Sequence, residues 1–240
     1  KVVCIRGQCS FEMVFNPQFN YARGDTILTK GKNGVYVTQG ERKGVLVSHR
    51  PFDIEKEKGA HSRIELSENE TEFFVFYYNV SEVEDVKNNF AYHEADLQKT
   101  EDYWREWVSR CELKKCYIPP KWHREVIRSA LVFKILFFEP IGTVAAAATT
   151  SLPEEIGGMR NWDYRFTWLR DSAFTFQALF RLGHIREADE YISFLMRVCK
   201  FSAEREGLEH LQIMYELTGE EELIEETLDH LEGYEQSAPV

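Results

Sequence analysis

One segment of the 240-residue sequence gathers side chains that could do chemistry together, Arg160 to Ser172, with the sequence RNWDYRFTWLRDS. Its thirteen residues include three arginines, two aspartates, two tryptophans and a tyrosine. A pocket for a neutral molecule with many hydroxyl groups needs flat aromatic faces against apolar C–H patches, and fixed donors and acceptors for individual hydroxyls. The side chains that offer both are Tyr164, Trp168, Arg170 and Asp171.

A competing interpretation of the same segment is structural. A neighbouring Arg–Asp pair beside aromatic residues is more often an ion pair with core packing, and the residue types alone favour that interpretation. Trp162 and Arg165 are interpreted as scaffolding in either case. The acidic residues close to the segment are tempting as catalytic groups, but nothing in their spacing supports that role: Glu154, Glu155 and Asp163.

The elements that position this segment begin with a β-rich stretch over residues 1–79. Short runs rich in Val, Phe, Tyr and Ile predict strands at CSFEMVF, GVYVT, GVLVS, SRIEL and TEFFVFYY. Turn signals such as GKNG, QGERKG and SENE separate these runs. Strands at this spacing, with no helical pattern between them, favour a β-sandwich over a parallel α/β sheet.

Helical patterns replace the strands from about residue 91, where ADLQKTEDYWREWVSR has apolar residues at helical spacing. Pro119 and Pro120 open a second helix, which runs to Pro140 and is apolar enough to be buried on more than one side. A short strand and a long loop follow, over IGTVAAAATTSLPEEIGGMRNWD. Further helices with glycine stops predict antiparallel hairpins, at about 166–182, 185–200, 207–218 and 221–232.

Charge and hydropathy exclude two classes of partner. Residues 203–240 carry twelve acidic side chains and one basic side chain, so this segment alone accounts for the net charge of −11. We interpret it as the solvated face of amphipathic helices. No basic stripe could follow a phosphate backbone, which argues against nucleic acid. The longest apolar stretch, residues 130–138, is interrupted by Lys134 and is too short to cross a bilayer.

The five cysteines are odd in number, which argues against a disulfide framework. Two pairs share the spacing C-x4-C, Cys4 with Cys9 and Cys111 with Cys116. That spacing suits a zinc site poorly, unless a turn at Gly7 brings the first pair together. We therefore predict reduced thiols, no metal and no cofactor. With no secretory signal at the start KVVCIRGQCS, a cytoplasmic location is expected.

A resemblance to a known family rests on residues 148–188, ATTSLPEEIGGMRNWDYRFTWLRDSAFTFQALFRLGHIREA. This run resembles glycoside hydrolase family 15, the glucoamylases, glucodextranases and prokaryotic trehalases. The similarity continues through HREVIRSALVFKILFFEPIGTVAAA, FEMVFNPQFNYARG, GLEHLQIMY and LDHLEGYEQSAPV, and so covers nearly the whole chain. In that family a β-sandwich is joined by helices to a six-hairpin (α/α) barrel. The resemblance thus implies a partial N-terminal β-sandwich domain at residues 1–80, a linker helical region at 81–118 and the N-terminal part of the catalytic barrel at 119–240, truncated at both ends.

The same resemblance assigns roles within the segment. Arg170 and Asp171 match the pair that holds hydroxyls of the non-reducing-end glucose, Trp168 matches a tryptophan of the pocket wall, and Tyr164 matches a tyrosine near the reaction centre. Family members invert the anomeric centre with one carboxylic acid and one carboxylate base. The family's acid motif, D-x-G-I-W-E-x-R, lies downstream of this segment, the base further on, and neither occurs in the 240 residues. Ala147 stands where a proline is common, and a local effect on the loop is expected.

The sequence therefore predicts an incomplete chain of an inverting exo-acting α-glucoside hydrolase that releases glucose from α-glucans or from trehalose. It holds the glucose subsite but no catalytic residue, so the 240-residue chain alone is expected to be inactive. The alternative is a non-catalytic carbohydrate-binding or regulatory remnant of the same fold. Phosphorolysis in a related barrel family fits the W-D-Y-R-F-T-W-L-R-D motif less well.

Overall fold

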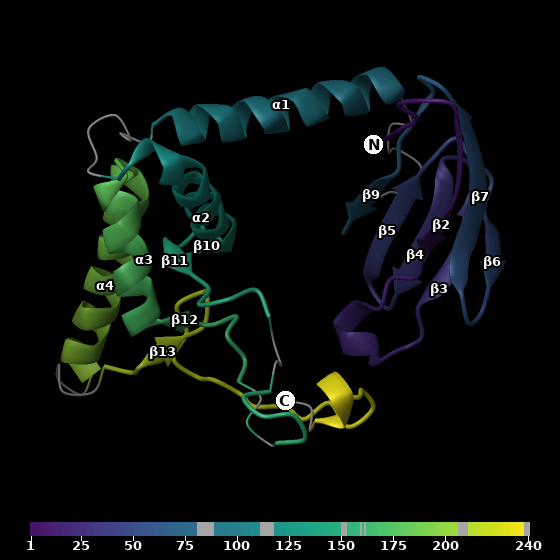
Figure 1. Cartoon of the computed structure of the whole chain (residues 1–240). Helices are drawn as coiled ribbons and strands as arrows, with labels where there is room; N and C mark the ends of the chain where they lie inside the picture. The colour runs from purple at the N-terminus through teal and green to yellow at the C-terminus, as the bar shows by residue number, and fades with distance from the viewer. Residues whose placement is uncertain are drawn as a thin grey trace. The chain divides into compact units, whose positions relative to one another are not determined.

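The computed structural model describes residues 1–80, 89–110, 118–149, 153–158, 160, 162–205 and 211–237. It forms two compact units, Lys1–Asp102 and Tyr103–Val240. The first unit is built mostly of strands and the second mostly of helices (Figure 1). The predicted order of β structure followed by helices is confirmed.

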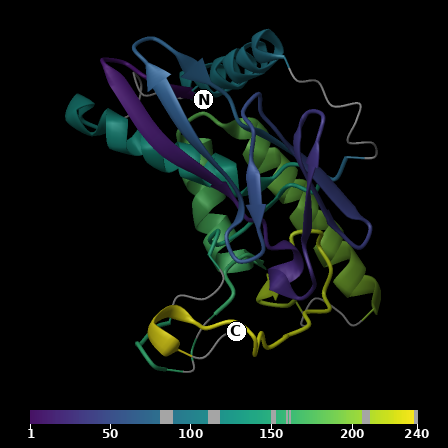
Figure 2. The same ribbon diagram turned by 90° about the vertical axis from the view of Figure 1, so that its right-hand side faces the viewer.

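The first unit contains nine strands among its described residues, in two main sheets. One sheet has the order β2-β7-β6 and the other β3-β4-β5-β9, while β1 pairs with β8. Figure 2 shows the long antiparallel strands β2 and β7 side by side. The strands are β1 (Val2–Val3), β2 (Gln8–Phe15), β3 (Ile27–Gly31), β4 (Gly34–Gln39), β5 (Arg42–Val47), β6 (Asp53–Glu55), β7 (Gly59–Ser67), β8 (Thr71–Glu72) and β9 (Val75–Tyr78), with the short 3-10 segment η1 (Phe19–Ala22) after β2.

The two main sheets share one core. Phe15 and Ala60 from one sheet pack in the same cluster as Val35, Val37 and Leu46 from the other. Side chains on a strand alternate between its faces, so each sheet contributes every second residue to this layer. The packing is that of the β-sandwich which the strand pattern predicts.

All five predicted runs contain strands, and the differences lie at short elements. The run TEFFVFYY is divided into β8 and β9, and the sequence pattern missed β1, β3 and β6. The segment β6 is only three residues, Asp-Ile-Glu, two of them exposed and charged. Such a segment becomes a strand because β7 offers it backbone partners, and its own residues carry little β signal.

Helix α1 (Phe90–Ser109) begins where the helical pattern predicts. Asn89 caps it, because its Oδ1 accepts a hydrogen bond from the Ala91 N–H at 2.9 Å. The helix spans the boundary between the two units: His93 is buried against Phe73 in the first, and Trp107 is buried in the second.

The second unit is organised around three further helices and short strand pairs. Helices α3 and α4 lie antiparallel and side by side, next to α2 (Figure 1). Strand β10 pairs with β11, and β12 pairs with β13. The elements are η4 (Pro120–Trp122), α2 (His123–Leu136), β10 (Phe137–Phe138), β11 (Thr143–Val144), β12 (Thr167–Trp168), α3 (Leu169–Arg181), α4 (Ile185–Arg205), β13 (Met214–Tyr215) and η6 (Tyr234–Gln236).

The predicted hairpin of α3 and α4 is confirmed, including its glycine stop. Gly183 has a φ of +95°, a left-handed conformation that glycine adopts without a steric penalty. Its N–H donates to the carbonyl of Phe180 at 3.0 Å, and the N–H of His184 donates to that of Leu179 at 3.0 Å. These two bonds form a Schellman motif, which satisfies the last carbonyls of α3 and turns the chain into α4.

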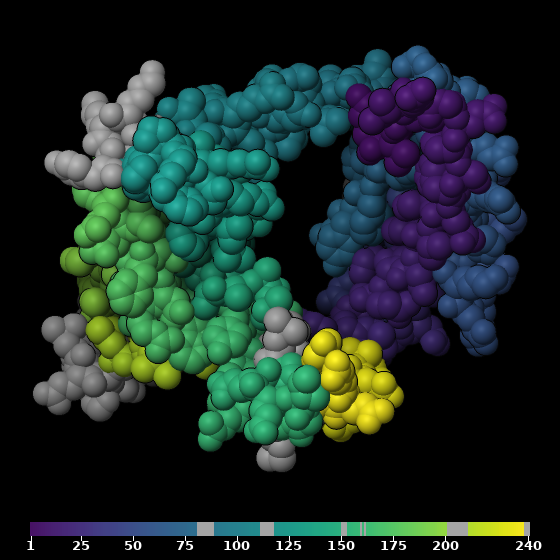
Figure 3. All heavy atoms as spheres, in the orientation of Figure 1, coloured from purple at the N-terminus to yellow at the C-terminus, as the bar shows by residue number. Residues whose placement is uncertain are grey.

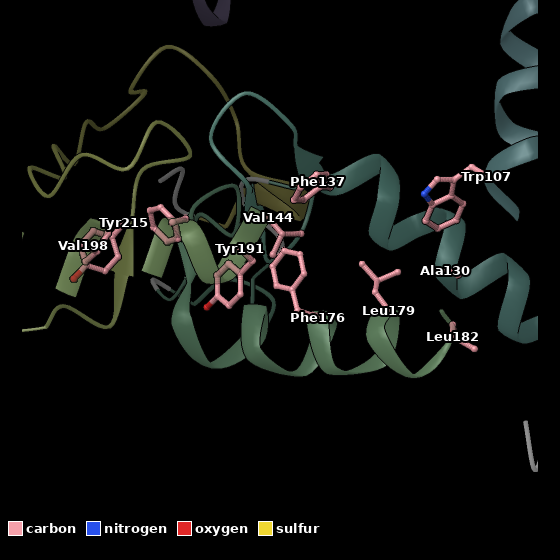
Figure 4. Close-up of a cluster of buried hydrophobic side chains, with 11 residues drawn as sticks. Trp107, Ala130, Phe137, Val144, Phe176, Leu179, Leu182, Tyr191, Val198 and Tyr215 are labelled. Atoms are coloured by element: carbon pink, nitrogen blue, oxygen red, sulfur yellow. The ribbon is translucent and has the colours of Figure 1, made fainter. Parts of the chain in front are cut away.

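One apolar core joins the elements of this unit, as Figure 4 shows. Phe176 stacks on Tyr191 with ring centroids 4.1 Å apart, which holds α3 against α4. The edge of Phe194 meets Tyr215 of β13. The buried members are Trp107, Ala130, Phe137, Val144, Phe176, Leu179, Leu182, Tyr191, Phe194, Val198 and Tyr215.

A buried ion pair lies beside this core and ties three helices together. The Nζ of Lys134 on α2 is 3.1 Å from Oε1 of Glu187 on α4. The Nε1 of Trp107 on α1 donates to the same oxygen at 2.7 Å. His184 stacks on the Trp107 ring with centroids 3.7 Å apart. The two opposite charges and the indole donor satisfy one another where water does not reach.

The prediction that the second helix is buried on more than one side is wrong. Ala130 and Lys134 are the buried residues of α2, whereas Val132 and Ile135 are 42% and 64% exposed. The helix also ends at Leu136, and the next two residues form β10. Among the described residues, α3 contacts α2 and Ala130 packs in the core with Trp107 of α1, while Val132 and Ile135 stay uncovered.

The predicted helix at 207–218 is also wrong over the described residues 211–218, while 206–210 lie outside the described part. Met214 and Tyr215 pair with β12 instead. Tyr215 is fully buried, and the Thr143 hydroxyl donates to the Leu217 carbonyl at 2.6 Å. These long-range contacts outweigh the helical spacing of the leucines, because apolar burial and backbone pairing are both satisfied by the strand.

The predicted helix at 221–232 is absent as well: this segment has no regular helix or strand. Its acidic residues recur four positions apart, as in Glu221 and Glu225 or Glu222 and Glu226, and like charges at that spacing destabilise a helix. Ile224 is 71% exposed, so no apolar face is buried in compensation. A helix this short depends on such burial.

A glycine at the β10–β11 turn provides a test of this fold. Gly142 has a φ of +80°, and a Cβ there would lie 2.5 Å from the backbone oxygen of Glu190. Replacing Gly142 with alanine is expected to lower the free energy of unfolding by about 2–4 kcal/mol, from backbone strain and the clash together. Gly157→Ala is the matched control, because its φ is +79° and its Cβ would meet nothing within 4 Å.

Chemical denaturation of the two variants measures the difference. The control is expected to lose only the left-handed strain of about 1–2 kcal/mol. Equal losses in the two variants would mean that the turn at Gly142 is not packed against α4.

Candidate functional site

The segment from Arg160 to Ser172 enters the helical unit through β12 and continues into α3. Strand β12 pairs with β13 in the register Thr167 with Tyr215 and Trp168 with Met214. The Leu169 N–H donates to the Ile213 carbonyl at 3.1 Å, which extends the pairing to the start of the helix. The predicted loop-to-helix junction is therefore held by a strand that the sequence pattern did not reveal.

Tyr164 lies in the loop before β12 and is half-buried. Its carbonyl accepts a hydrogen bond from the Ala147 N–H at 2.8 Å. Its ring stacks on that of Trp168, with centroids 6.2 Å apart and an interplanar angle of 27°. A proline at position 147 would have no N–H to donate, so the alanine noted in the sequence gives Tyr164 a backbone anchor.

Trp168, Arg170 and Asp171 lie next to one another at the start of α3. The Arg170 guanidinium lies over the Trp168 ring, with Cζ 5.7 Å from the centroid. Its Nη2 is 3.1 Å from Oδ2 of Asp171, in the first turn of the helix, where a negative charge is favoured. Trp168 Nε1 is buried and has no hydrogen-bond partner among the described residues. The structure thus brings all four sequence-predicted residues together.

A hollow of about 320 Å³ that is open to solvent, here called the cavity, lies at this place, and Ile213 in its wall is 71% exposed. Trp168 and Arg170 line it, whereas Tyr164 and Asp171 do not. Four lining residues were missed by sequence reasoning: Leu169, Leu211, Gln212 and Ile213. The last three belong to the segment that was predicted as a helix, so their place became visible only with the β12–β13 pairing. The one signal that marked them is the resemblance of GLEHLQIMY to the family.

Two acidic residues close in sequence to the site residues, Asp163 and Glu154, are held by local partners. Asp163 accepts from Arg165 Nε at 3.0 Å and from Nη2 at 2.6 Å, a two-point pair within the loop. Glu154 Oε1 accepts from Trp162 Nε1 at 2.7 Å. These contacts agree with the interpretation of Trp162 and Arg165 as scaffolding, and they place both carboxylates in structural bonds.

The loop before the site is also tied to the end of the described chain. The Gly157 N–H donates to Oγ of the buried Ser237 at 2.9 Å. Figure 3 shows the C-terminal segment, in yellow, lying against this green loop. The contact gives the long loop a partner within the helical unit.

Two further features bear on cofactors and location. At the turn at Gly7, with a φ of +70°, the Cys4 thiol donates to the carbonyls of Arg6 at 3.7 Å and Gly7 at 3.6 Å. Burial and the neighbouring Cys9 thiol raise the pKa of the Cys4 thiol. Within the described ranges, however, no group of three or more His, Cys, Asp or Glu could hold a metal ion. Cys111 and Cys116 lie outside those ranges. No helix in the described part of the chain is long and apolar enough to span a membrane.

Residues 121–240 match the family described as Glycosyl hydrolases family 15, and the chain belongs to this family. No solved structure matches the chain significantly.

Its curated relatives include trehalases from archaea and bacteria. The trehalase of Thermoplasma acidophilum is 34% identical over 228 residues, which are 94% of this chain and 36% of that protein. The trehalase of Mycolicibacterium smegmatis is 44% identical over 153 residues, 62% of this chain and 22% of that protein. Trehalase 1 of Sulfolobus acidocaldarius is 30% identical over 234 residues, which are 96% of this chain and 37% of that protein. The chain thus spans about a third of the length of the relatives that match most of it.

Proposed function

We propose that the complete protein is an inverting, exo-acting α-glucoside hydrolase with trehalose as its substrate, and that this chain supplies the pocket for one glucose unit. The observation that carries the proposal is the cavity lined by Trp168 and Arg170, with Tyr164 and Asp171 beside it. The relatives named trehalases favour trehalose over starch-type or dextran-type glucans.

The residues of the cavity suit a sugar in complementary ways. The Trp168 ring offers an apolar face to the C–H groups of a glucose ring. Tyr164, in the loop, stacks on the Trp168 ring and supports it. Arg170 presents several N–H donors in a fixed plane, and the Asp171 carboxylate accepts from hydroxyl groups. Together these side chains bind and orient the glucose unit at the scissile bond.

Cleavage by inversion needs a carboxylic acid to protonate the leaving oxygen and a carboxylate to activate water, roughly 6.5–9.5 Å apart. We assign neither role to a residue of this chain, since Asp163 and Glu154 are held by Arg165 and Trp162. In this proposal residues 1–80 belong to the β-sandwich domain, 81–118 to a linker and 119–240 to the first part of the six-hairpin barrel. Positions 81–88 and 111–117 of the linker lie outside the described residues. The protein acts in the cytoplasm.

Glucose release from trehalose, maltose and isomaltose tests the proposal. The 240-residue chain is expected to release none, and the protein encoded by the complete gene is expected to hydrolyse trehalose. Release by the short chain would show that its own residues supply the acid and base. If neither form releases glucose although both are folded, hydrolysis is rejected and the carbohydrate-binding alternative is supported.

A further inference from the structure

The side chains that line the cavity differ in whether they donate or accept hydrogen bonds. Three of its six described lining residues have polar side chains: Trp168, Arg170 and Gln212. An indole and a guanidinium can only donate hydrogen bonds, whereas the amide of glutamine both donates and accepts. A sugar hydroxyl also does both, so lining groups that only donate would leave its proton to the Asp171 carboxylate, which lies beside the cavity and does not line it. Among these side chains, Gln212 alone provides an acceptor.

Gln212 reaches the cavity from a different segment than Trp168 and Arg170. Its own N–H donates to the hydroxyl of Tyr215 at 3.0 Å, and Tyr215 is fully buried. The next residue, Ile213, accepts from the Leu169 N–H through its carbonyl. The backbone on both sides of the Gln212 side chain is therefore tied to the start of α3 and to the core.

The side chain of Gln212 is not consumed by these structural bonds. It is half-buried, and within the described part of the chain its amide makes no hydrogen bond. A polar side chain with a fixed backbone, an uncommitted amide and a position on a cavity wall is suited to bind a ligand there. Because the backbone of Gln212 is already fixed, binding costs less conformational entropy.

We propose that Gln212 is a substrate-binding residue of the glucose pocket, with its amide Oε1 accepting a hydrogen bond from a sugar hydroxyl and its Nε2 donating to a neighbouring one. This inference rests on the proposed function for the identity of the sugar. It adds an uncharged donor and acceptor to the charged pair Arg170 and Asp171. The chemical class that Gln212 selects is a ring with adjacent free hydroxyls.

The first measurement is the dissociation constant of D-glucose for the protein encoded by the complete gene, determined by calorimetry. Gln212→Leu keeps much of the side-chain volume and removes both hydrogen-bonding groups, so its dissociation constant is expected to rise about 10- to 100-fold. Gln212→Glu keeps an acceptor oxygen and is expected to recover part of the affinity. Gln98→Leu is the matched control, because it makes the same substitution at an exposed glutamine of α1 that does not line the cavity, and it is expected to leave glucose binding unchanged.

Monodeoxyglucoses separate a direct contact from a structural role. The wild-type protein is expected to lose affinity when the hydroxyl that Gln212 contacts is missing, and Gln212→Leu is expected to lose nothing more for that same analogue. A merely structural role would weaken all analogues equally, and that result would overturn the inference. So would unchanged glucose binding in Gln212→Leu, or an absence of glucose binding in the wild-type protein.

Trehalose hydrolysis distinguishes this inference from the proposed function. If the complete protein binds glucose through Gln212 but hydrolyses no trehalose, the assigned activity fails and the binding residue stands. If it hydrolyses trehalose and Gln212→Leu keeps the wild-type KM and kcat, the assigned activity stands and the role of Gln212 is rejected.

Discussion

Replacing Glu187 with alanine is expected to lower the free energy of unfolding of the helical unit by about 3–5 kcal/mol. The Glu187 and Lys134 side chains are only 5% and 7% exposed, and their charges lie 3.1 Å apart. Removing the carboxylate would leave the buried Lys134 ammonium, within the described part of the chain, with Glu139 at 3.6 Å and the Phe137 ring. It would also leave the Trp107 N–H without its acceptor. The loss is large because neither group can be solvated by water where it lies.

Chemical denaturation at neutral pH, followed by tryptophan fluorescence, measures this loss. Glu106→Ala is the matched control, because Glu106 forms an exposed pair with Arg110 on α1. Exposed pairs of this kind contribute about 0–1 kcal/mol, so the control is expected to stay close to the wild-type protein. A Glu187→Ala variant within 1 kcal/mol of the wild-type protein would contradict the structural role of the buried pair.

The pH dependence gives a second readout for the same variant. Burial alone would raise the pKa of Glu187, but the hydrogen bonds from Trp107 and Lys134 outweigh it and hold the pKa below its ordinary value of 4.5. The stability contributed by this carboxylate is therefore present above about pH 4.5 and is lost as the pH falls further. The difference between the wild-type protein and Glu187→Ala is expected to be constant near neutrality and to shrink in acid.

The second large effect is expected on activity. Replacing Arg170 with methionine is expected to lower kcat/KM for trehalose at least about 100-fold in the complete-gene protein, because two charge-assisted hydrogen bonds to hydroxyls would be lost. Stability is expected to change by less than about 1 kcal/mol, since the Arg170 side chain is 70% exposed and its pair with Asp171 is a surface pair. Activity and stability therefore separate at this residue.

Initial rates and thermal unfolding of three variants test this expectation. Arg170→Lys keeps the charge but loses the planar donor fork, so it is expected to fall between the wild-type protein and Arg170→Met. Arg186→Met is the control, because Arg186 is a comparably exposed arginine paired with Glu190 on α4. If Arg170→Met keeps the wild-type kcat/KM, Arg170 does not bind the substrate.

The features that the sequence alone determined are those encoded over a few neighbouring residues. The alternation of apolar residues specified five runs of strand, and the apolar stripe with its glycine stop specified the hairpin of α3 and α4. The four candidate residues fall within eight positions, Tyr164 to Asp171, so their proximity follows from local chain geometry. The family resemblance could be read from the same run for the same reason.

Tertiary structure decided what depends on partners distant in sequence. The spacing of leucines after residue 207 predicts helix, but β12 offers backbone partners to Met214 and the core offers a site to Tyr215. That pairing moved Gln212 to the wall of the cavity, more than forty residues along the chain from Trp168. Local propensity differs between helix and strand by about 1 kcal/mol per residue or less, whereas burying one aromatic side chain contributes more. Packing therefore overrode the helical pattern at Met214 and Tyr215, whereas over 221–232 like charges and the lack of a buried face left the pattern without a helix.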